Sequence, residues 1–334
     1  MAKMRCCIIA TPAFTPYIEG ATDRRSRNHC QQCSEAAEIF HNLSVVIASR
    51  IIFLLLFSGR NGMKRPENPD KKAFTVLNDP EARMVANCPV LVTGGARRIG
   101  KAIVEDLARH GFPVAIHCNR SLDEGEAIVN RINDSGGNAC VVQADLEGDV
   151  RGLVKQASDR IGPIRLLVNN ASLFQEDKVG ALDMALWDRH FAVHLKTPVI
   201  LAEDMPKALP EDQDGLVVNI IDQRVWKLNP QFFSYTLSKT ALWNATRTLA
   251  QALAPRIRVN AIAPGPTLPS ERQRPEDFER QVSKLPLQRA PELPEFGRTV
   301  RYFWENRSIT GQMIALDGGQ HLAWETPDIA GITE

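Results

Sequence analysis

The chain has 334 residues, of which 44% are hydrophobic and 24% charged; this composition is typical of a soluble globular protein with a sizeable core. A formal net charge of +1 excludes the broad electrostatic field that attracts nucleic acid or an anionic membrane, so we expect neither partner. The seven cysteines show no disulfide spacing in the main body of the chain, which favours a reducing, cytoplasmic location.

Residues 1–87 lack a sustained alternation of strand and helix patterns. The apolar run Leu43–Gly59 is interrupted by an arginine and is shorter than the roughly 20 residues that a membrane span requires. Cys30 and Cys33 form a single CxxC pair, and one such pair without a second predicts no metal site. We interpret this segment as a largely disordered extension and polar leader, or as a start assigned too early, with later candidates at Met63 and Met84.

Residues 88–325 read as alternating strands and helices, and residues 326–334 as a C-terminal tail. Short runs rich in valine and isoleucine are separated by amphipathic patterns such as Lys101–Gly111. Continuous apolar runs are typical of strands buried on both faces, so we expect one α/β domain with a doubly wound parallel sheet of the Rossmann type. The predicted strands are Pro89–Gly94, Pro113–Cys118, Ala139–Ala144, Arg165–Asn170, Gly215–Ile221 and Arg256–Ala263.

A glycine-containing loop follows the first predicted strand directly and opens the first predicted helix. It reads TGGARRIG from Thr93, with an arginine at the place of the middle glycine of the usual dinucleotide fingerprint. The amino terminus of the helix is suited to bind a pyrophosphate. The residues expected to contact the dinucleotide in this loop are Gly94, Arg97, Arg98, Ile99 and Gly100.

The end of the second predicted strand favours NADP over NAD. An acid at this place would bind the ribose 2′-hydroxyl of NAD, whereas the chain has Asn119, Arg120 and Ser121. These donors, with Arg97, suit a 2′-phosphate; a solvated loop arginine is the alternative. After the third strand, we expect Asp145 and Leu146 at the adenine, although an acid there is also a common helix N-cap.

Tyr235 and Lys239 are four residues apart and therefore share one face of a predicted helix. We expect the lysine ammonium to favour the phenolate and so to lower the pKa of the tyrosine toward that of a general acid. Asp222 stands thirteen residues before the tyrosine. The three side chains are the predicted catalytic groups.

Several motifs together resemble the short-chain dehydrogenase/reductase family over residues 88–322. They are the TGGARRIG loop, Asp145, the NNAS sequence of Asn169–Ser172, Tyr235 with Lys239, Pro264-Gly265 and the sequence Ile309–Gly319. The resemblance implies a seven-stranded parallel sheet, a nicotinamide near the tyrosine and a homotetramer. It also implies contacts to the cofactor from Asn170, Ala171, Ser172, Tyr235, Lys239, Pro264 and Gly265.

Departures from the usual family pattern are similar to those of the pteridine reductase branch. The family usually has a serine at the place of Asp222 and a glycine at the place of Ser172. The resemblance implies that a pterin stacks between the nicotinamide and a phenylalanine, and that an aspartate and a tyrosine transfer the proton. The implied substrate-binding residues are Arg98, Ser172, Phe174, Asp222 and Tyr235.

The chemistry of a pterin agrees with these residues. A flat ring suits a phenylalanine wall, and its amino-pyrimidinone edge carries donors that suit a carboxylate. NADPH would supply a hydride to a ring C=N bond, and Tyr235 with Asp222 would relay the proton. His194, where most members have asparagine, resembles the dihydromonapterin reductases; we expect either a proton-relay role or a structural hydrogen bond to the backbone.

Other interpretations stay open from the sequence. A generic carbonyl or 3-oxoacyl reductase is disfavoured by Asp222, because a carboxylate would repel a developing alkoxide. An NADPH sensor or scaffold is disfavoured by the intact pair of Tyr235 and Lys239. The segment Thr267–Leu293 is expected to be a mobile lid, and the sequence does not distinguish biopterin, monapterin or folate as the substrate.

Overall fold

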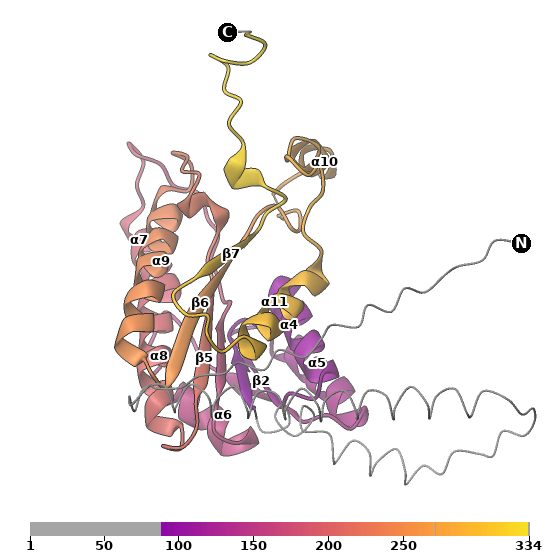
Figure 1. The fold of residues 1–334 in the computed structure, drawn as a ribbon, viewed down its shortest axis with the longest axis vertical. Helices are drawn as coiled ribbons and strands as arrows, with labels where there is room; N and C mark the ends of the chain where they lie inside the picture. Colours follow the sequence, from indigo (N-terminus) through magenta and orange to yellow (C-terminus); the bar gives the residue numbers. More distant parts are fainter. Residues whose placement is uncertain (1–87, 271, 333–334) are drawn as a thin grey trace, which may run out of the picture. The chain divides into compact units, whose positions relative to one another are not determined.

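The computed structural model describes residues 88–270 and 272–332. The CxxC pair, the apolar run Leu43–Gly59 and the alternative start sites lie outside these residues. The described chain forms seven parallel strands in the order β3-β2-β1-β4-β5-β6-β7, with helices on both faces (Figure 1). The predicted doubly wound sheet is therefore confirmed. No helix in this described part is both long and apolar enough to cross a membrane.

Six strands fall where the apolar runs predict them, and the seventh, β7, is the strand that only the family resemblance implied. Each of the six is slightly shorter than its run or is shifted by one residue from it. The strands are β1 (Val90–Val92), β2 (Val114–Cys118), β3 (Ala139–Gln143), β4 (Leu166–Asn169), β5 (Gly215–Ile220), β6 (Ile257–Pro264) and β7 (Met313–Leu316).

Successive strand residues enter two different cores, which is why most residues of the strands are apolar. In β1, Val90 and Val92 pack into one core and Leu91 packs into the other. The first core is covered by α4 (Arg98–Arg109), α5 (Leu122–Asp134) and α11 (Leu293–Glu305). The second core is covered by α6 (Leu153–Ile161), α8 (Thr197–Ala208) and α9 (Phe233–Leu253).

The second helical layer contains an irregular turn close to α9. A π-helical segment, η1 (Ala192–Lys196), joins α7 (Met184–Phe191) to α8 without a break in the helix. Single π turns of this kind occur frequently at functional sites. Here the π turn carries His194, which is buried.

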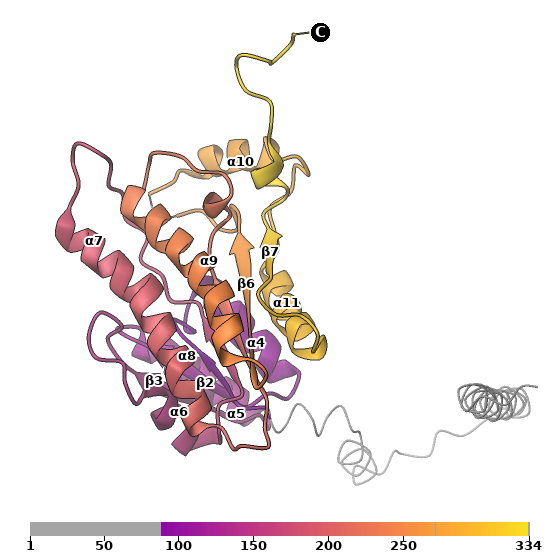
Figure 2. The ribbon, with the colours of Figure 1, turned by 60° about the vertical axis from the view of Figure 1, so that its left-hand side comes forward.

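All seven strands end at the same edge of the sheet, and short elements surround this edge. They are two 3₁₀ turns, η2 (Gln223–Val225) and η3 (Gln320–Leu322), and the helix α10 (Pro275–Ser283). Figure 2 shows α10 beyond the ends of β6 and β7. The predicted lid segment Thr267–Leu293 therefore lies where ligands bind in open parallel sheets.

Helices α4 and α11 pack closely because a glycine stands at their crossing. A Cβ atom on Gly297 would lie 2.3 Å from the Cβ atom of Asp106. The carboxylate of Asp106 accepts a hydrogen bond of 2.8 Å from Nε of Arg301 on α11. The close approach therefore brings a mostly buried ion pair together in addition to the apolar contacts.

Gly297→Ala should destabilise the protein, because the added methyl group forces α4 and α11 apart. Overpacking of this kind costs about 1–3 kcal/mol, measured as the change in the free energy of unfolding in urea. Gly148→Ala is the matched control, since its new Cβ would meet only the Asp145 carbonyl oxygen, at 3.4 Å. Equal stability of the two variants would contradict the close packing.

Candidate active site

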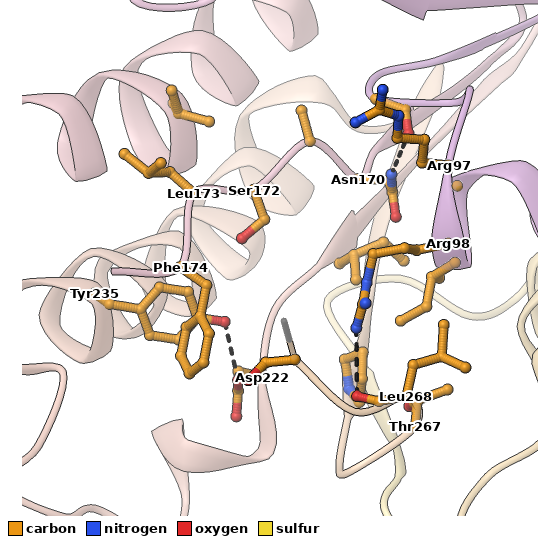
Figure 3. A pocket seen from close by; sticks show the side chains of 18 of the residues that line it. Arg97, Arg98, Asn170, Ser172, Leu173, Phe174, Asp222, Tyr235, Thr267 and Leu268 are labelled. Atoms are coloured by element: carbon orange, nitrogen blue, oxygen red, sulfur yellow. Dashed lines mark hydrogen bonds between the residues drawn. The ribbon is translucent and has the colours of Figure 1, made fainter. Parts of the chain in front are cut away.

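A pocket of about 1060 Å³ lies at the carboxyl ends of the strands. Its walls come from the loops that follow β1 to β6, from α9 and from the lid segment, and Figure 3 shows its central part. Nearly all predicted site residues line it, and His194 does not. They are Gly94, Arg97, Arg98, Ile99, Gly100, Asn119, Arg120, Ser121, Asp145, Leu146, Asn170, Ala171, Ser172, Phe174, Asp222, Tyr235, Lys239, Pro264 and Gly265.

The loop after β1 is held tightly against the start of α4. A Cβ atom on Gly100 would lie 2.2 Å from the Gly94 carbonyl oxygen, so only glycine fits this turn. The side-chain amide of Asn170 donates to the carbonyl oxygens of Thr93, at 2.9 Å, and Gly94, at 3.1 Å. These contacts fix the loop, and its pocket side is available to a ligand such as a pyrophosphate.

His117 on β2 supports the same loop and was not among the predicted site residues. Its Nδ1 accepts a hydrogen bond of 3.1 Å from the Gly94 amide, and its Nε2 lies 3.1 Å from the Ala144 carbonyl oxygen. Burial lowers the pKa of His117, so the ring is neutral and donates from Nε2. The sequence signal was a histidine inside an otherwise apolar strand.

The loop after β2 provides the nucleotide end of the pocket. Asn119 donates to the carboxylate of Asp145 at 3.3 Å, which also accepts from the backbone amide of Glu147. Arg97 forms an ion pair with Glu124. Arg120 is exposed and has no carboxylate partner among the described residues. A 2′-phosphate therefore fits beside Arg120, whereas binding by Arg97 requires competition with Glu124.

Tyr235 and Asp222 meet directly at the other end of the pocket (Figure 3). The tyrosine hydroxyl donates to Oδ2 of Asp222 at 2.9 Å, and the Arg224 amide donates to Oδ1 at 2.8 Å. Asp222 follows β5 and caps the turn η2, while Tyr235 lies in the first turn of α9. The two predicted groups are therefore adjacent, and the carboxylate also stabilises the turn that presents it.

The pKa of Tyr235 is shifted in the direction opposite to the one expected from the sequence. Burial and the adjacent Asp222 carboxylate raise the pKa of Tyr235 well above 10. The ammonium of Lys239 donates to the Ile220 carbonyl oxygen at 2.9 Å and lies 5.8 Å from the centroid of the Tyr235 ring. The predicted lowering of the tyrosine pKa is wrong. Tyr235 keeps its proton, and its hydroxyl donates a hydrogen bond to Asp222.

The other two groups of the cluster are also shifted by burial. Burial raises the pKa of the Asp222 carboxyl, although Arg224 and the hydrogen bonds oppose this change. Burial lowers the pKa of Lys239 to about 8, and Asp222 acts in the opposite direction. The charge of Lys239 is therefore lost as the pH rises through about 8.

His194 lies behind the pocket and connects its wall to α9. Its Nε2 accepts from the Leu173 amide at 3.0 Å and lies 3.1 Å from the Ser172 hydroxyl. Its Nδ1 lies 2.8 Å from the Ser238 hydroxyl, which itself donates to the Tyr235 carbonyl oxygen. The backbone amide can only donate, so Nδ1 carries the ring proton.

These contacts give His194 a positioning role for Ser172. Burial, Lys239 and His190 lower the pKa of His194 well below 6.5, so the ring is neutral. The Ser172 side chain also affects Tyr235: burial and Asp222 raise the pKa of the tyrosine, and Ser172 acts in the opposite direction. The predicted relay of protons through His194 stays a prediction.

Phe174 forms part of the pocket wall and is supported from behind. It stacks on Phe232 with ring centroids 4.3 Å apart and planes at 9°, and it meets Tyr235 edge to face. Phe174 lines the pocket whereas Phe232 does not. Trp226 is likewise absent from the pocket and contacts His321 and Trp243. Phe174 thus contributes an aromatic surface to the pocket wall.

Arg98 is directed toward the lid segment (Figure 3). Its guanidinium donates to the carbonyl oxygens of Pro269 at 3.1 Å and Leu268 at 3.3 Å. The residue therefore joins the dinucleotide loop to the start of the lid. Its predicted contact with the substrate stays a prediction.

The amino terminus of α9 has an anchor that the sequence did not indicate. The buried Asp177 side chain accepts from the Ser234 amide at 3.0 Å, and Nδ1 of the buried His190 lies 2.7 Å from the Ser234 hydroxyl. Both contacts bridge distant parts of the chain. They fix the turn of α9 that carries Tyr235.

The fold and this site define a dinucleotide-binding oxidoreductase. Residues 89–279, more than half of the chain, match the family described as short chain dehydrogenase. The chain therefore belongs to the short-chain dehydrogenase family, as predicted.

Individual relatives cover most of the catalytic domain. A crystal structure of FolM alternative dihydrofolate reductase 1 from Brucella canis, complexed with NADP, is 99% identical; the match covers 75% of this chain and 100% of that one, with a TM-score of 0.74. A 3-oxoacyl-[acyl-carrier-protein] reductase of Staphylococcus epidermidis is 29% identical, covering 71% of this chain and 100% of the relative. A dihydromonapterin reductase of Escherichia coli is 28% identical, covering 70% and 97%.

Arg120→Gln should weaken NADPH binding by at least about tenfold and leave NADH binding nearly unchanged, because only NADPH carries the 2′-phosphate. Fluorescence titration of the two nucleotides measures the difference. Arg131→Gln is the control, since Arg131 pairs with Glu105 on α4 and does not line the pocket. Equal loss of both nucleotides would assign a structural role to Arg120.

Proposed function

We propose that this protein is an NADPH-dependent reductase that converts a dihydropterin into a tetrahydropterin. The observation that carries the proposal is the 2.9 Å hydrogen bond from the Tyr235 hydroxyl to the Asp222 carboxylate. This acid stands in the pocket that also contains the dinucleotide loop. The NADP complex of the Brucella canis protein supports the choice of cofactor.

The wall residues support a pterin rather than an acyl thioester. Asp222 presents acceptor oxygens, which suit the donors of an amino-pyrimidinone edge. A 3-oxoacyl substrate would instead place a developing oxyanion near this carboxylate, which is unfavourable. The aromatic surface of Phe174 supports a flat ring. The name of the Escherichia coli relative, dihydromonapterin reductase, is consistent with these contacts.

The proton comes from the Tyr235–Asp222 pair. When bound, NADPH supplies the hydride that the ring carbon receives. Tyr235 holds its proton in the structure and can donate it toward the ring nitrogen, directly or through water. Asp222 accepts from Tyr235 as a carboxylate, so the proton that restores the phenolate comes from solvent, and Asp222, whose pKa burial raises, can take it up and pass it on. The ammonium of Lys239 stabilises the negative charge that remains on the pair.

Activity should fall above about pH 8, because Lys239 loses its charge there. The check is the dependence of kcat/KM for a dihydropterin on pH, with saturating NADPH. Asp222→Asn removes the negative charge that raises the pKa of Lys239, so the basic limb of its residual activity should move to lower pH. An unmoved limb in this variant would assign the limb to another group.

We also propose a homotetramer in the cytoplasm. The family resemblance supports the tetramer, together with the exposed apolar side chains of Leu322 and Trp324 beyond β7. The free thiols of Cys88, Cys118 and Cys140 support a reducing compartment.

The decisive test is a panel of substrates whose reduction is measured through the oxidation of NADPH. Dihydromonapterin, dihydrobiopterin and dihydrofolate are set beside an acetoacetyl thioester, and we expect turnover of at least one pterin, with a kcat/KM at least about 100-fold above that of the thioester. Turnover of the thioester alone would establish the 3-oxoacyl reductase instead. NADPH binding without turnover of any substrate would favour a sensor.

A further inference from the structure

Two arginines lie beside the aromatic pair of Phe174 and Phe232 and line the pocket. The guanidinium carbon of Arg224 is 5.5 Å from the Phe174 ring centroid and 5.1 Å from that of Phe232. For Arg272, both distances are 5.8 Å. Nearly equal distances to two stacked rings place each cation alongside the stack and not on its outer face. The aromatic surface of Phe174 is therefore flanked by positive charge.

These two arginines differ from the pocket arginines that form close ion pairs with carboxylates. Arg97 and Arg189 of the pocket pair with Glu124 and Glu147. On the lid helix, Arg274 and Arg280 both pair with Asp277. Neither Arg274 nor Arg280 lines the pocket.

Arg272 has no carboxylate within 4 Å in the described part of the chain. Its guanidinium donates to the Phe174 carbonyl oxygen at 2.8 Å, which leaves further donors of its planar group available. The nearest carboxylate oxygen to Arg224 is Oδ1 of Asp222, at 4.0 Å. That carboxylate is already the acceptor for Tyr235 and for the backbone amide. The part of the pocket wall formed by Arg224 and Arg272, called the rim below, thus has an excess of positive charge.

The reacting ring does not account for this excess. A pterin ring and a polyol side chain are neutral, whereas a p-aminobenzoylglutamate side chain carries carboxylates. Arginine binds carboxylates through two parallel hydrogen bonds. Arg224 and Arg272 line the same pocket as Phe174 and Asp222, so they are within reach of a side chain that extends from a ring bound there.

We propose that Arg272, assisted by Arg224, binds the carboxylates of the substrate side chain and so makes the protein selective for folate-type dihydropterins. This inference rests on the proposed pterin reductase function. It assigns to the rim of the pocket a selectivity that the ring-binding residues cannot supply, since all dihydropterins present the same ring to Asp222 and Phe174.

The test compares KM for dihydrofolate and dihydromonapterin in wild type, Arg272→Gln and Arg272→Lys, with saturating NADPH. Arg272→Gln should raise KM for dihydrofolate about tenfold more than KM for dihydromonapterin. Arg272→Lys should recover part of the lost affinity for dihydrofolate, because lysine keeps the positive charge but cannot form the two parallel hydrogen bonds of a guanidinium. Added salt should raise KM for dihydrofolate more than KM for dihydromonapterin in wild type, and this difference should shrink in Arg272→Gln.

The matched control is Arg274→Gln on the same lid segment, which removes an arginine that pairs with Asp277 and does not line the pocket. It should leave both KM values within about twofold of wild type. Equal loss of both substrates in Arg272→Gln would overturn the inference, because Arg272 would then act only through Phe174. Unchanged KM values would overturn it as well. A wild type that reduces neither dihydropterin would overturn the proposed function, and the inference with it.

Discussion

Parallel strands that are buried on both faces must satisfy their backbone hydrogen bonds within the sheet, and this constraint determines where the site can form. The pairing of β1 with β2 and β4, and of β4 with β5, brings four strand ends to one edge. The loops after these strands carry Gly94, Arg120, Ser172 and Asp222, which all line the pocket. The position of the pocket therefore follows from the pairing of the strands. The helices cover the two faces of the sheet.

A second set of contacts fixes the tyrosine relative to that edge. The π turn η1 places His194 between Ser172 on the loop after β4 and Ser238 on α9. Asp177 holds the first turn of the same helix. Buried neutral histidines with both nitrogens engaged are rigid connections. Tyr235 is thus positioned from two sides, which is what proton transfer to a bound ring requires.

The cluster of Tyr235, Asp222 and Lys239 brings opposing electrostatic effects together. Burial disfavours the charged form of each group, so it raises the pKa of the two acids and lowers that of the lysine. The positive charge of Arg224 lowers the pKa of both Tyr235 and Asp222. Arg224 thus opposes the effect of burial on both acids, although both pKa values remain raised.

The sequence by itself determined the parallel sheet, the dinucleotide loop and the family, because these depend on apolar runs and on motifs that are continuous in the chain. It also identified Asp222 as the unusual acid. The tertiary structure alone decided the protonation of Tyr235, the engaged nitrogens of His194 and the supports at His117 and Asp177. Each of these features depends on burial and on contacts between residues more than ten positions apart, and neither can be read from the amino-acid sequence.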